Sequence, residues 1–436
     1  MDLPGLPDVP GQLSGQFSRL LSLLRRPLPP AAALLRRPLP LAAAVLTVAA
    51  LGLGGAALAG AFPGQGAGLP GLLGGHATRA ARPVPAVKLR LSPADGATGV
   101  RLDAHAKVTA SGGSIRSVRV TAPDGTQVAG KLAKDHRTWT STAVLAPGSR
   151  YRMTAVGANR AGVAARRSGS FTTLLPAAVL GAGVMPLDGE RVGVGMPVAV
   201  FFDQPVTDRA AVQRRLHVDT SRPVEGAWRW FNDKEVHYRP RTYWPTGTRV
   251  TLRAALNGVD AGSGVWGERD HVVSFSIGDR HVSVVNVNSH QMKVASNGRT
   301  LKVFPMSAGR PKYPTTNGIH FTLEKARTVT MDSATVGIPR DSPDGYYEKV
   351  HWNVRISNTG EFVHAAPWSV GSQGSANVSH GCVNLSTTNA IWFYKFSRRG
   401  DVVQVVGSPK RPNGWSLGVV DWNMSWSQWT SGSALR

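Results

Sequence analysis

Short runs that alternate apolar and polar residues recur along most of the chain after position 84. Examples are the segments 87–91, 117–121 and 151–155. Alternation with a period of two is the pattern of a strand with one buried face. Turn pairs such as Asp124-Gly125 lie between these runs, as expected for antiparallel sheets with short connections. The pattern therefore predicts a mainly β protein.

Two of the β units resemble each other. The sequence SPADG at 92–96 is matched by MPLDG at 185–189, and a strand that contains phenylalanine closes each unit. Self-similarity at the spacing of one domain is typical of tandem repeats. The chain lacks the Cys…Trp…Cys pattern of antibody domains, so "Ig-like" refers here to a sandwich architecture only. We expect Ig-like domain 1 at 84–175 and Ig-like domain 2 at 176–279.

An aromatic cluster in the second unit has two interpretations. It could form a face on which sugar rings stack, or it could pack inside the domain or between domains. We favour packing, because large aromatic side chains most often supply buried area. The cluster consists of Trp228, Trp230, Phe231 and Tyr238, with Tyr243 and Trp244 close behind.

The third region, 280–407, is also predicted to be rich in strands. Asn297-Gly298 is a strong hairpin signal. One helix is expected at Thr387–Arg398, with Ser386 as its N-cap and Gly400 just after its end. The expected strands are 282–287, 291–294, 301–304, 321–323, 328–331, 362–365 and 402–406.

The start of the chain predicts a membrane anchor. No Asp, Glu, Lys or Arg lies between Arg37 and Arg79, and the 22 residues 41–62 are apolar or small, enough for a transmembrane helix. The preceding arginines orient segment 1–40 towards the cytoplasm. Segment 63–83, rich in Gly and Pro, is expected to be a flexible linker. A cleaved secretory signal or a buried helix are the alternatives. We therefore expect a single-pass protein of the cell membrane, with the bulk of the chain outside the cytoplasm, in the cell wall space.

The net charge of the chain limits the classes of binding partner that we expect. The formal net charge is +24 and the sequence pI is about 11.1, which favours a polyanion as partner. The basic residues are scattered and form no compact run with interleaved aromatics, so no nucleic acid is expected. Anionic cell-wall polymers and the membrane remain as expected surfaces.

The sharpest chemical signal surrounds the single cysteine. Cys382 lies in the segment SHGCVN at 379–384. A catalytic cysteine needs a base near the thiol and backbone N–H donors for the oxyanion. Gly381 removes side-chain bulk before the thiol and permits a turn closed to other residues. His364 ends a predicted strand 18 residues upstream, and a loop can return it to Cys382. We also expect the Cys382 amide to lie just before a helix, where N–H groups are free.

Two other interpretations stay open on chemistry alone. His364, His380 and Cys382 could bind a metal, although they offer neither a carboxylate nor a clear fourth ligand. Alternatively, Cys382 could be a small buried hydrophobic residue beside two incidental histidines.

These residues resemble the L,D-transpeptidase (YkuD) family. The family signature is an upstream His, a loop, and then Ser/Thr-His-Gly-Cys followed by an apolar residue and Asn or Arg, which this chain matches at 364 and 379–384. The similarity spans about 280–436 and includes HAAPW at 364–368, WFY at 392–394 and RGD at 399–401. The layout is similar to that of mycobacterial-type members, with a membrane segment, two Ig-like domains, a catalytic domain at 280–407 and a Trp-rich extension at 408–436.

The resemblance implies a role for each residue of the motif. Cys382 is the acylated nucleophile, His364 its general base, and the backbone carbonyl of Ala365 orients the histidine ring. His380 and Gly381 shape the oxyanion region. Ser379 and Asn384 are expected at the substrate or its loop. No cofactor and no metal are implied.

The resemblance also implies a flap over the site, in the segment 331–346. Tyr346 and Met331 match residues that line the family's pocket, and Trp368 is a further candidate for substrate contact. Val336 stands where relatives carry a tyrosine, so one wall of the pocket is expected to be more open. Ordinary core packing is the alternative for Tyr346 and Trp368.

The activity implied is peptidoglycan L,D-transpeptidation. Cys382 would attack the bond before the terminal D-Ala of a tetrapeptide stem, and the amine of a second stem would resolve the thioester into a 3→3 crosslink. An L,D-carboxypeptidase of the same chemistry and a non-catalytic wall-binding protein are the alternatives. In the tail, Trp422, Trp426 and Trp429 have the spacing of one helix face, which predicts burial against the catalytic domain.

Overall fold

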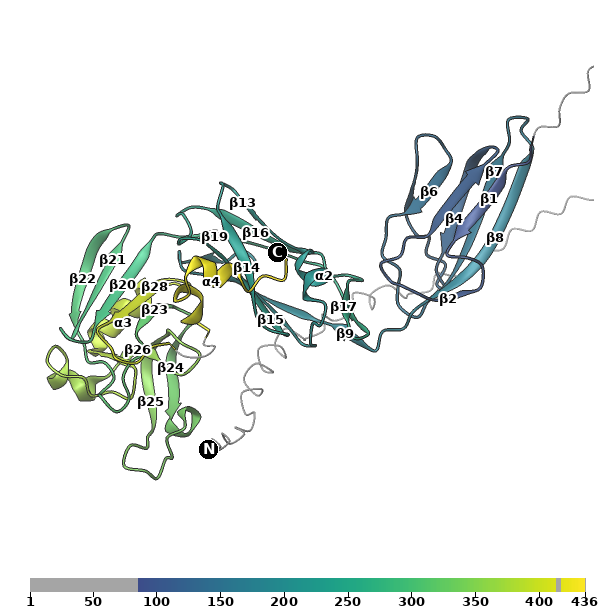
Figure 1. Cartoon of the computed structure of the whole chain (residues 1–436). Helices are drawn as coiled ribbons and strands as arrows, with labels where there is room; N and C mark the ends of the chain where they lie inside the picture. Colours follow the sequence, from purple (N-terminus) through teal and green to yellow (C-terminus); the bar gives the residue numbers. More distant parts are fainter. Residues whose placement is uncertain (1–84, 413–416, 436) are drawn as a thin grey trace, which may run out of the picture. The chain divides into compact units, whose positions relative to one another are not determined.

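The computed structural model describes residues 85–412 and 417–435 (Figure 1). The predicted segments 1–40, 41–62 and 63–83 lie outside the described residues, so the anchor stays a prediction. In the described ranges, no helix is long and apolar enough to span a membrane. Strands dominate these ranges, which confirms a mainly β protein.

The first β unit consists of two four-stranded sheets. One has the order β1-β3-β6-β5 and the other β2-β8-β7-β4. Their inner faces share a core that includes Tyr151, Met153 and Phe171. The strands are β1 (Lys88–Ser92), β2 (Ala97–Val100), β3 (Lys107–Ser111), β4 (Ser114–Thr121), β5 (Gly130–Leu132), β6 (Thr138–Ser141), β7 (Arg150–Ala158) and β8 (Ala164–Thr173).

The second β unit also pairs two four-stranded sheets, with the orders β10-β12-β15-β14 and β11-β19-β16-β13. A small sheet of β17, β18 and β9 lies beside them. The elements are β9 (Ala178–Leu180), β10 (Ala182–Met185), β11 (Arg191–Val192), β12 (Val198–Phe202), α2 (Arg209–Gln213), β13 (Leu216–Thr220), β14 (Gly226–Asn232), β15 (Glu235–Pro240), β16 (Arg249–Ala254), β17 (Asp260–Gly262), β18 (Val265–Gly267) and β19 (His271–Ile277).

The matching motifs of the two units make the same contact. Asp95 accepts a hydrogen bond from the backbone N of Ser170 at 2.7 Å, and Asp188 accepts one from Ser274 at 2.8 Å. In both units the following glycine donates back to the same serine. The repeat read from the sequence therefore corresponds to one local structure used twice.

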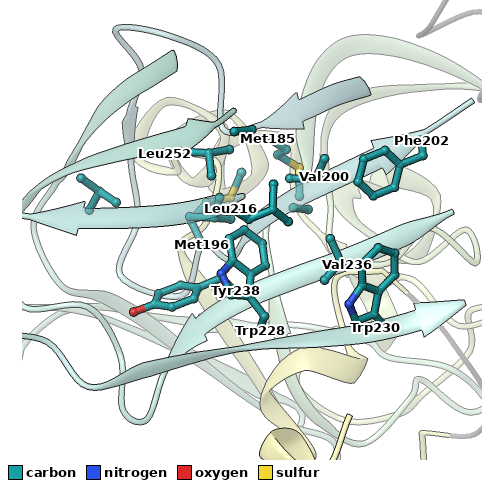
Figure 2. Packing of buried hydrophobic residues seen from close by; sticks show 14 of the residues in the cluster. Met185, Met196, Val200, Phe202, Leu216, Trp228, Trp230, Val236, Tyr238 and Leu252 are labelled. Atoms are coloured by element: carbon teal, nitrogen blue, oxygen red, sulfur yellow. The ribbon is translucent and has the colours of Figure 1, made fainter. Parts of the chain in front are cut away.

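The aromatic cluster of the second unit is packed inside it. Trp228, Trp230 and Tyr238 belong to its hydrophobic core, where Figure 2 shows them beside Met196 and Val236. These side chains are at most 8% exposed. The packing interpretation is thus confirmed for them, and a sugar-stacking face is not available on these rings.

The third region contains two further sheets. A five-stranded sheet has the order β22-β21-β20-β28-β23, and a four-stranded sheet the order β24-β25-β26-β27. Helix α3 contacts β25, β26 and β27. The elements are β20 (His281–Asn286), β21 (Gln291–Ser296), β22 (Arg299–Pro305), β23 (Gly318–Phe321), β24 (Glu324–Asp332), η1 (Ser333–Val336), β25 (Tyr347–Arg355), β26 (Phe362–Ala365), η2 (Pro367–Ser372), β27 (Val383–Leu385), α3 (Thr387–Phe396) and β28 (Val402–Val406).

In this region, the sequence predicted the turn residues accurately, but the ends of helices and strands less accurately. Asn297 and Gly298 both have positive φ, as the predicted hairpin requires. Ser386 caps α3, and its hydroxyl accepts from the Asn389 amide at 3.3 Å. The helix ends at Phe396, earlier than expected, because Ser397 has an extended conformation with a ψ of 143°. The Ser397 hydroxyl donates to the Phe393 carbonyl at this end. Strands β25 and β27 were not predicted.

The prediction for the C-terminal tail was wrong in two respects. Trp422 ends the short 3-10 helix η3 (Val420–Trp422), whereas Trp426 and Trp429 belong to α4 (Trp426–Thr430), so no single helix carries all three. All three rings lie within 6 Å of the Arg239 guanidinium of the second unit. The Trp429 indole also donates to the Ala227 carbonyl at 2.9 Å. The buried guanidinium of Arg239 thus holds the three tryptophans against the second unit and not against the third region.

The second unit and the third region share a tight seam. The Gly193 amide donates to the Arg399 carbonyl at 2.7 Å, and Glu190 forms an ion pair with the Arg399 side chain at 2.8 Å. A Cβ on Gly193 would lie 2.3 Å from the backbone nitrogen of Asp401. Only glycine therefore lets the two backbones approach this closely.

We predict that Gly193→Ala lowers the free energy of unfolding by about 1–3 kcal/mol, because the added methyl group overpacks the seam. Chemical denaturation of the full chain measures this change. Gly371→Ala is the matched control, since a Cβ there meets nothing within 4 Å. Equal stability losses in both variants would contradict a seam that depends on glycine.

Candidate active site

Parallel pairing of β26 with β27 brings the two predicted reactive residues together. The register sets Val363 opposite Val383 and His364 opposite Asn384. Val363 and Val383 belong to the hydrophobic core of the domain, so the alternate positions face the other way. Cys382 directly precedes β27 and shares that outer face with His364. Two residues far apart in sequence thus become diagonal neighbours on one sheet.

His364 is held in a defined tautomer. Its side chain is buried, and its Nδ1 lies 2.9 Å from the carbonyl oxygen of Ala365. Because a carbonyl can only accept, Nδ1 carries the proton and Nε2 keeps a free lone pair. Burial lowers the pKa of His364 to about 4, despite this hydrogen bond. The ring is therefore neutral at pH 7 and able to accept a proton.

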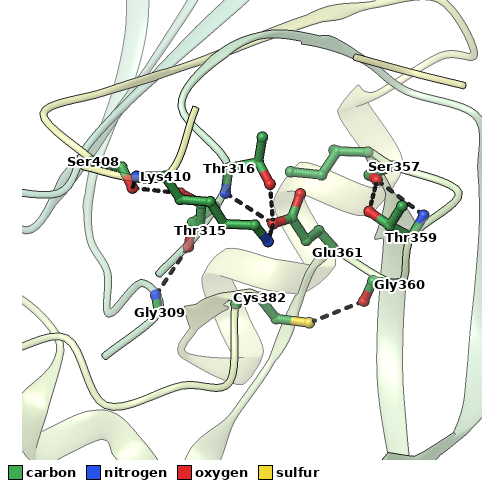
Figure 3. A network of polar contacts seen from close by, with 12 residues as sticks. Gly309, Thr315, Thr316, Ser357, Thr359, Gly360, Glu361, Cys382, Ser408 and Lys410 are labelled. Carbon is green, nitrogen blue, oxygen red and sulfur yellow. Dashed lines mark hydrogen bonds and ion pairs between the residues drawn. The ribbon is translucent and has the colours of Figure 1, made fainter. Parts of the chain in front are cut away.

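Cys382 is a protonated thiol in this state. Burial raises its pKa to about 12, and the nearby Glu361 carboxylate adds to the increase. The Sγ atom lies 3.7 Å from the carbonyl oxygen of Gly360 (Figure 3), so the S–H group donates to a backbone acceptor. The structure thus holds a neutral thiol and a neutral imidazole on one face of the β26–β27 edge.

The turn before the cysteine is fixed by Ser379 and Gly381. The Ser379 hydroxyl donates to the Cys382 carbonyl at 2.6 Å and accepts from the Gly381 amide at 3.1 Å. Gly381 has a φ of +126°, a region that favours glycine. The expected helix directly after Cys382 was wrong, because β27 intervenes before α3. The backbone N–H groups next to the thiol therefore belong to a turn and not to a helix terminus.

Asn384 and Trp368 border His364. The Asn384 amide nitrogen donates to the Ser369 hydroxyl at 3.1 Å, while its Oδ1 is buried without a partner among the described residues. The Trp368 ring lies 6.1 Å from the His364 ring and is 56% exposed. Asn384 therefore holds β27 in place opposite His364. Trp368 presents an exposed apolar surface near the His364 ring.

The predicted flap connects β24 to β25. Met331 lies on β24 opposite Glu348, close to where the flap begins. The Ser333 amide and the Tyr346 carbonyl close its base at 3.0 Å. A Cβ on Gly360 would lie 2.9 Å from Cγ1 of Val336. Val336 therefore packs against the residue that accepts from the Cys382 thiol, and the flap covers this side of the site.

His380 joins the flap to the cysteine motif. Its Nε2 accepts a hydrogen bond from the Arg310 guanidinium at 2.7 Å, and its ring lies between those of Tyr313 and Tyr346. Arg310 also forms an ion pair with Asp344 of the flap. Burial and the Arg310 charge lower the pKa of His380, which keeps it a neutral acceptor. His380 thus contacts the flap through Tyr346 and, by way of Arg310, is linked to Asp344.

Sequence reasoning missed several residues that shape the site. Arg310 and Asp344 carry no motif, and only their pairing across the flap reveals them. Gly360 and Glu361 were also missed, because no motif marks them and only the fold shows that Glu361 is buried. Opposite His364, the register of β25 shifts between His351 and Val354, a bulge of the kind that re-aims side chains at active sites.

None of these contacts requires a metal. The described ranges hold no group of three or more His, Cys, Asp or Glu side chains suited to an ion. His364 and His380 are engaged by a backbone carbonyl and by a guanidinium instead. The arrangement offers a nucleophile, a neutral base and a glycine turn, which together suit acyl transfer.

Comparison with known proteins places the chain among its relatives. Residues 280–405 match the family model of the L,D-transpeptidase catalytic domain, and residues 97–260 match that of a bacterial Ig domain. L,D-transpeptidase 2 of Mycobacterium tuberculosis (strain CDC 1551 / Oshkosh) is 42% identical over 347 residues, which are 80% of this chain and 85% of that protein. L,D-transpeptidase 5 of Mycobacterium tuberculosis (strain ATCC 25618 / H37Rv) is 38% identical over 363 residues, 81% of this chain and 78% of that protein.

A solved structure of an L,D-transpeptidase in complex with imipenem is 41% identical, with a TM-score of 0.47, and covers 53% of this chain and 100% of its own. The relatives cover most of both chains at high identity. The predictions of a peptidoglycan L,D-transpeptidase and of an Ig region before the catalytic domain are confirmed. The chain therefore belongs to the YkuD family of L,D-transpeptidases.

Proposed function

We propose that transpeptidation proceeds through a thioester on Cys382, with His364 as the base. The supporting observation is the pair itself, in which an unprotonated Nε2 and a protonated thiol share one face of the β26–β27 edge. As Sγ bonds to the carbonyl carbon before the terminal D-Ala, the thiol proton passes to His364. The imidazolium then returns this proton to the leaving amine, and free D-Ala departs.

The backbone around Gly381 would stabilise the oxyanion of the tetrahedral intermediate. Its positive φ turns the chain at Cys382, and Ser379 holds the turn through the Cys382 carbonyl. Preorganised donors of this kind contribute a large share of acyl-transfer catalysis. Tyr346, Met331 and Trp368 would line the stem peptide, with Asn384 supporting His364 from the neighbouring strand.

The second half-reaction decides the product. The side-chain amine of another stem attacks the thioester carbon, loses a proton to the neutral His364, and forms a 3→3 crosslink while the thiol is released. Water in place of the amine would give an L,D-carboxypeptidase. We favour the amine as acceptor, because the relatives that match most of both chains carry the name L,D-transpeptidase.

We predict that the full chain converts tetrapeptide stems into crosslinked dimers with release of one D-Ala per bond, as measured by mass spectrometry. Cys382→Ala should lower this rate by a factor on the order of 10³ or more, because it removes the nucleophile. It should also abolish the covalent adduct that a carbapenem, a strained amide, forms with the wild type. Release of tripeptide without any dimer would contradict transpeptidation and support the carboxypeptidase.

We further propose that residues 41–62 anchor the protein in the cell membrane, with 1–40 cytoplasmic and 63–83 as a linker. Two Ig-like domains, at 84–175 and 176–279, would then carry the catalytic domain at 280–407 into the wall space. The extension at 408–436 would brace the catalytic domain against the second Ig-like domain. The contacts of the tail around Arg239 support this last assignment.

The first β unit offers a surface for anionic wall polymers. A groove over β4, β7 and β8 is lined by four exposed arginines and by several hydroxyl side chains, with no Asp or Glu in the lining. None of the four forms an ion pair with a carboxylate within the described ranges. Guanidinium groups bind phosphate and carboxylate in a bidentate manner. The arginines are Arg119, Arg150, Arg152 and Arg166.

We predict that the double variant Arg119→Gln/Arg152→Gln binds inorganic polyphosphate roughly tenfold more weakly than the wild type at low salt, with a shallower dependence on salt. Fluorescence anisotropy with a labelled polyphosphate measures both. Arg215→Gln/Arg222→Gln removes the same charge from exposed positions of the second unit and should change binding little. Equal losses of affinity in the two double variants would show that net charge alone causes the effect. That result would contradict a specific binding site in the groove.

A further inference from the structure

Glu361 is a buried carboxylate for which the reaction has no assigned role. It directly precedes β26 and is 4% exposed. Its Oε1 accepts from the backbone nitrogen of Thr316 at 2.8 Å and from the Thr316 hydroxyl at 2.7 Å, and it pairs with Nζ of Lys410 at 3.2 Å (Figure 3). Its Oε2 is buried and has no hydrogen-bond partner among the described residues.

The carboxylate lies next to the residues that hold the nucleophile. Glu361 follows Gly360, whose carbonyl oxygen is 3.7 Å from Sγ of Cys382. A Cβ on Gly381 would lie 3.8 Å from Cγ of Glu361 and 3.9 Å from its Oε1. Glu361 thus supports both the acceptor of the thiol and the glycine turn that precedes the thiol.

The contacts of Glu361 fasten three separate segments together. Thr315 accepts from the Gly309 amide at 2.9 Å through its hydroxyl and from the Ser408 hydroxyl at 2.5 Å through its carbonyl. Lys410 follows Ser408 in the segment after β28. The loop before β23, the start of β26 and the start of the C-terminal extension therefore meet at one carboxylate. Such a network leaves the Gly360 carbonyl little freedom to move.

The charge of Glu361 bears directly on the thiol. A buried carboxylate disfavours a second negative charge nearby. Burial makes the largest contribution to the raised pKa of Cys382, and the negative charge of Glu361 raises this pKa further. The positive charge of Arg355 lowers it. The charges of Glu348 and Arg355 on β25 also act on the thiol, and the thiol in turn acts on Tyr346. His364 lies on the same face of the sheet, and His380 is two residues upstream of Cys382.

We propose that Glu361 is a positioning residue for Cys382, which fixes the Gly360 carbonyl against the thiol and keeps the thiol protonated until an acyl donor is bound. This deepens the proposed thioester mechanism and relies on it only for the identity of the nucleophile. A resting enzyme of this kind reacts slowly with simple alkylating agents and oxidants, because the thiolate is the reactive form. The Cys382 thiol would react rapidly only with an electrophile whose binding lets His364 take the thiol proton.

The test is the pH dependence of alkylation of the full chain by iodoacetamide, without substrate. Cys382 is the only cysteine, so the intact mass reports on this one thiol. Glu361→Gln keeps an oxygen that can accept from Thr316 but removes the charge. We expect its alkylation at pH 7 to be at least about threefold faster than that of the wild type, with the profile shifted to lower pH.

Lys410→Met supplies the opposite change. It removes the cation that offsets Glu361, so alkylation should become slower and its profile should shift to higher pH. The Lys410 side chain is 43% exposed, so this variant keeps the proposal testable if Glu361→Gln does not fold. Glu225→Gln, which removes a carboxylate from an exposed pair in the second unit, is the control and should match the wild type.

Two results would overturn the proposal. One is a Glu361→Gln profile that overlays the wild type in a protein that unfolds at the same temperature. The other is a shift of Glu361→Gln and Lys410→Met in the same direction, which would indicate loss of packing alone. Because alkylation needs no stem peptide, normal alkylation together with absent crosslinking would count against the transpeptidation mechanism and not against Glu361.

Discussion

The parallel pairing of β26 with β27 is the constraint on which the site depends. It is short, with three residue pairs in register, yet it sets His364 and Cys382 on the same face of the sheet. The opposite face packs into the core through Val363, Val383 and Leu385. A shift of one residue would turn the histidine into the core and expose a valine. Core packing thus fixes the catalytic geometry as well as the fold.

Burial then determines the chemistry of the pair. Desolvation lowers the pKa of His364 and raises that of Cys382, so both groups are neutral when no substrate is present. The Ala365 carbonyl leaves Nε2 as the free acceptor. In the proposed reaction, proton transfer from the thiol to His364 would accompany bond formation at the substrate carbonyl instead of preceding it. The Arg310–Asp344 ion pair links the flap to His380 of the cysteine motif.

Much of this could be predicted from the sequence, and the exceptions have physical reasons. The hairpin at Asn297-Gly298, the Ser386 cap and the SHGC motif each depend on residues that are close together in the sequence. Such features can therefore be recognised from the sequence alone. Strand β25 was missed because its pattern is broken by the bulge near Trp352, whose φ is +58°. The tail was misplaced because its partner, Arg239, is a long-range contact. Glu361 was missed because only the fold shows that it is buried.

The central claim is that the free enzyme holds a neutral thiol beside a neutral imidazole with its proton on Nδ1. Nitrogen-15 NMR of the full chain, labelled at histidine, tests it most directly when His364 is assigned by comparison with His364→Gln. The account predicts one Nδ1–H tautomer for His364 from about pH 5 to pH 8, with protonation only near pH 4. An imidazolium signal for His364 at pH 7 that disappears in Cys382→Ala would reveal a preformed ion pair and contradict the account.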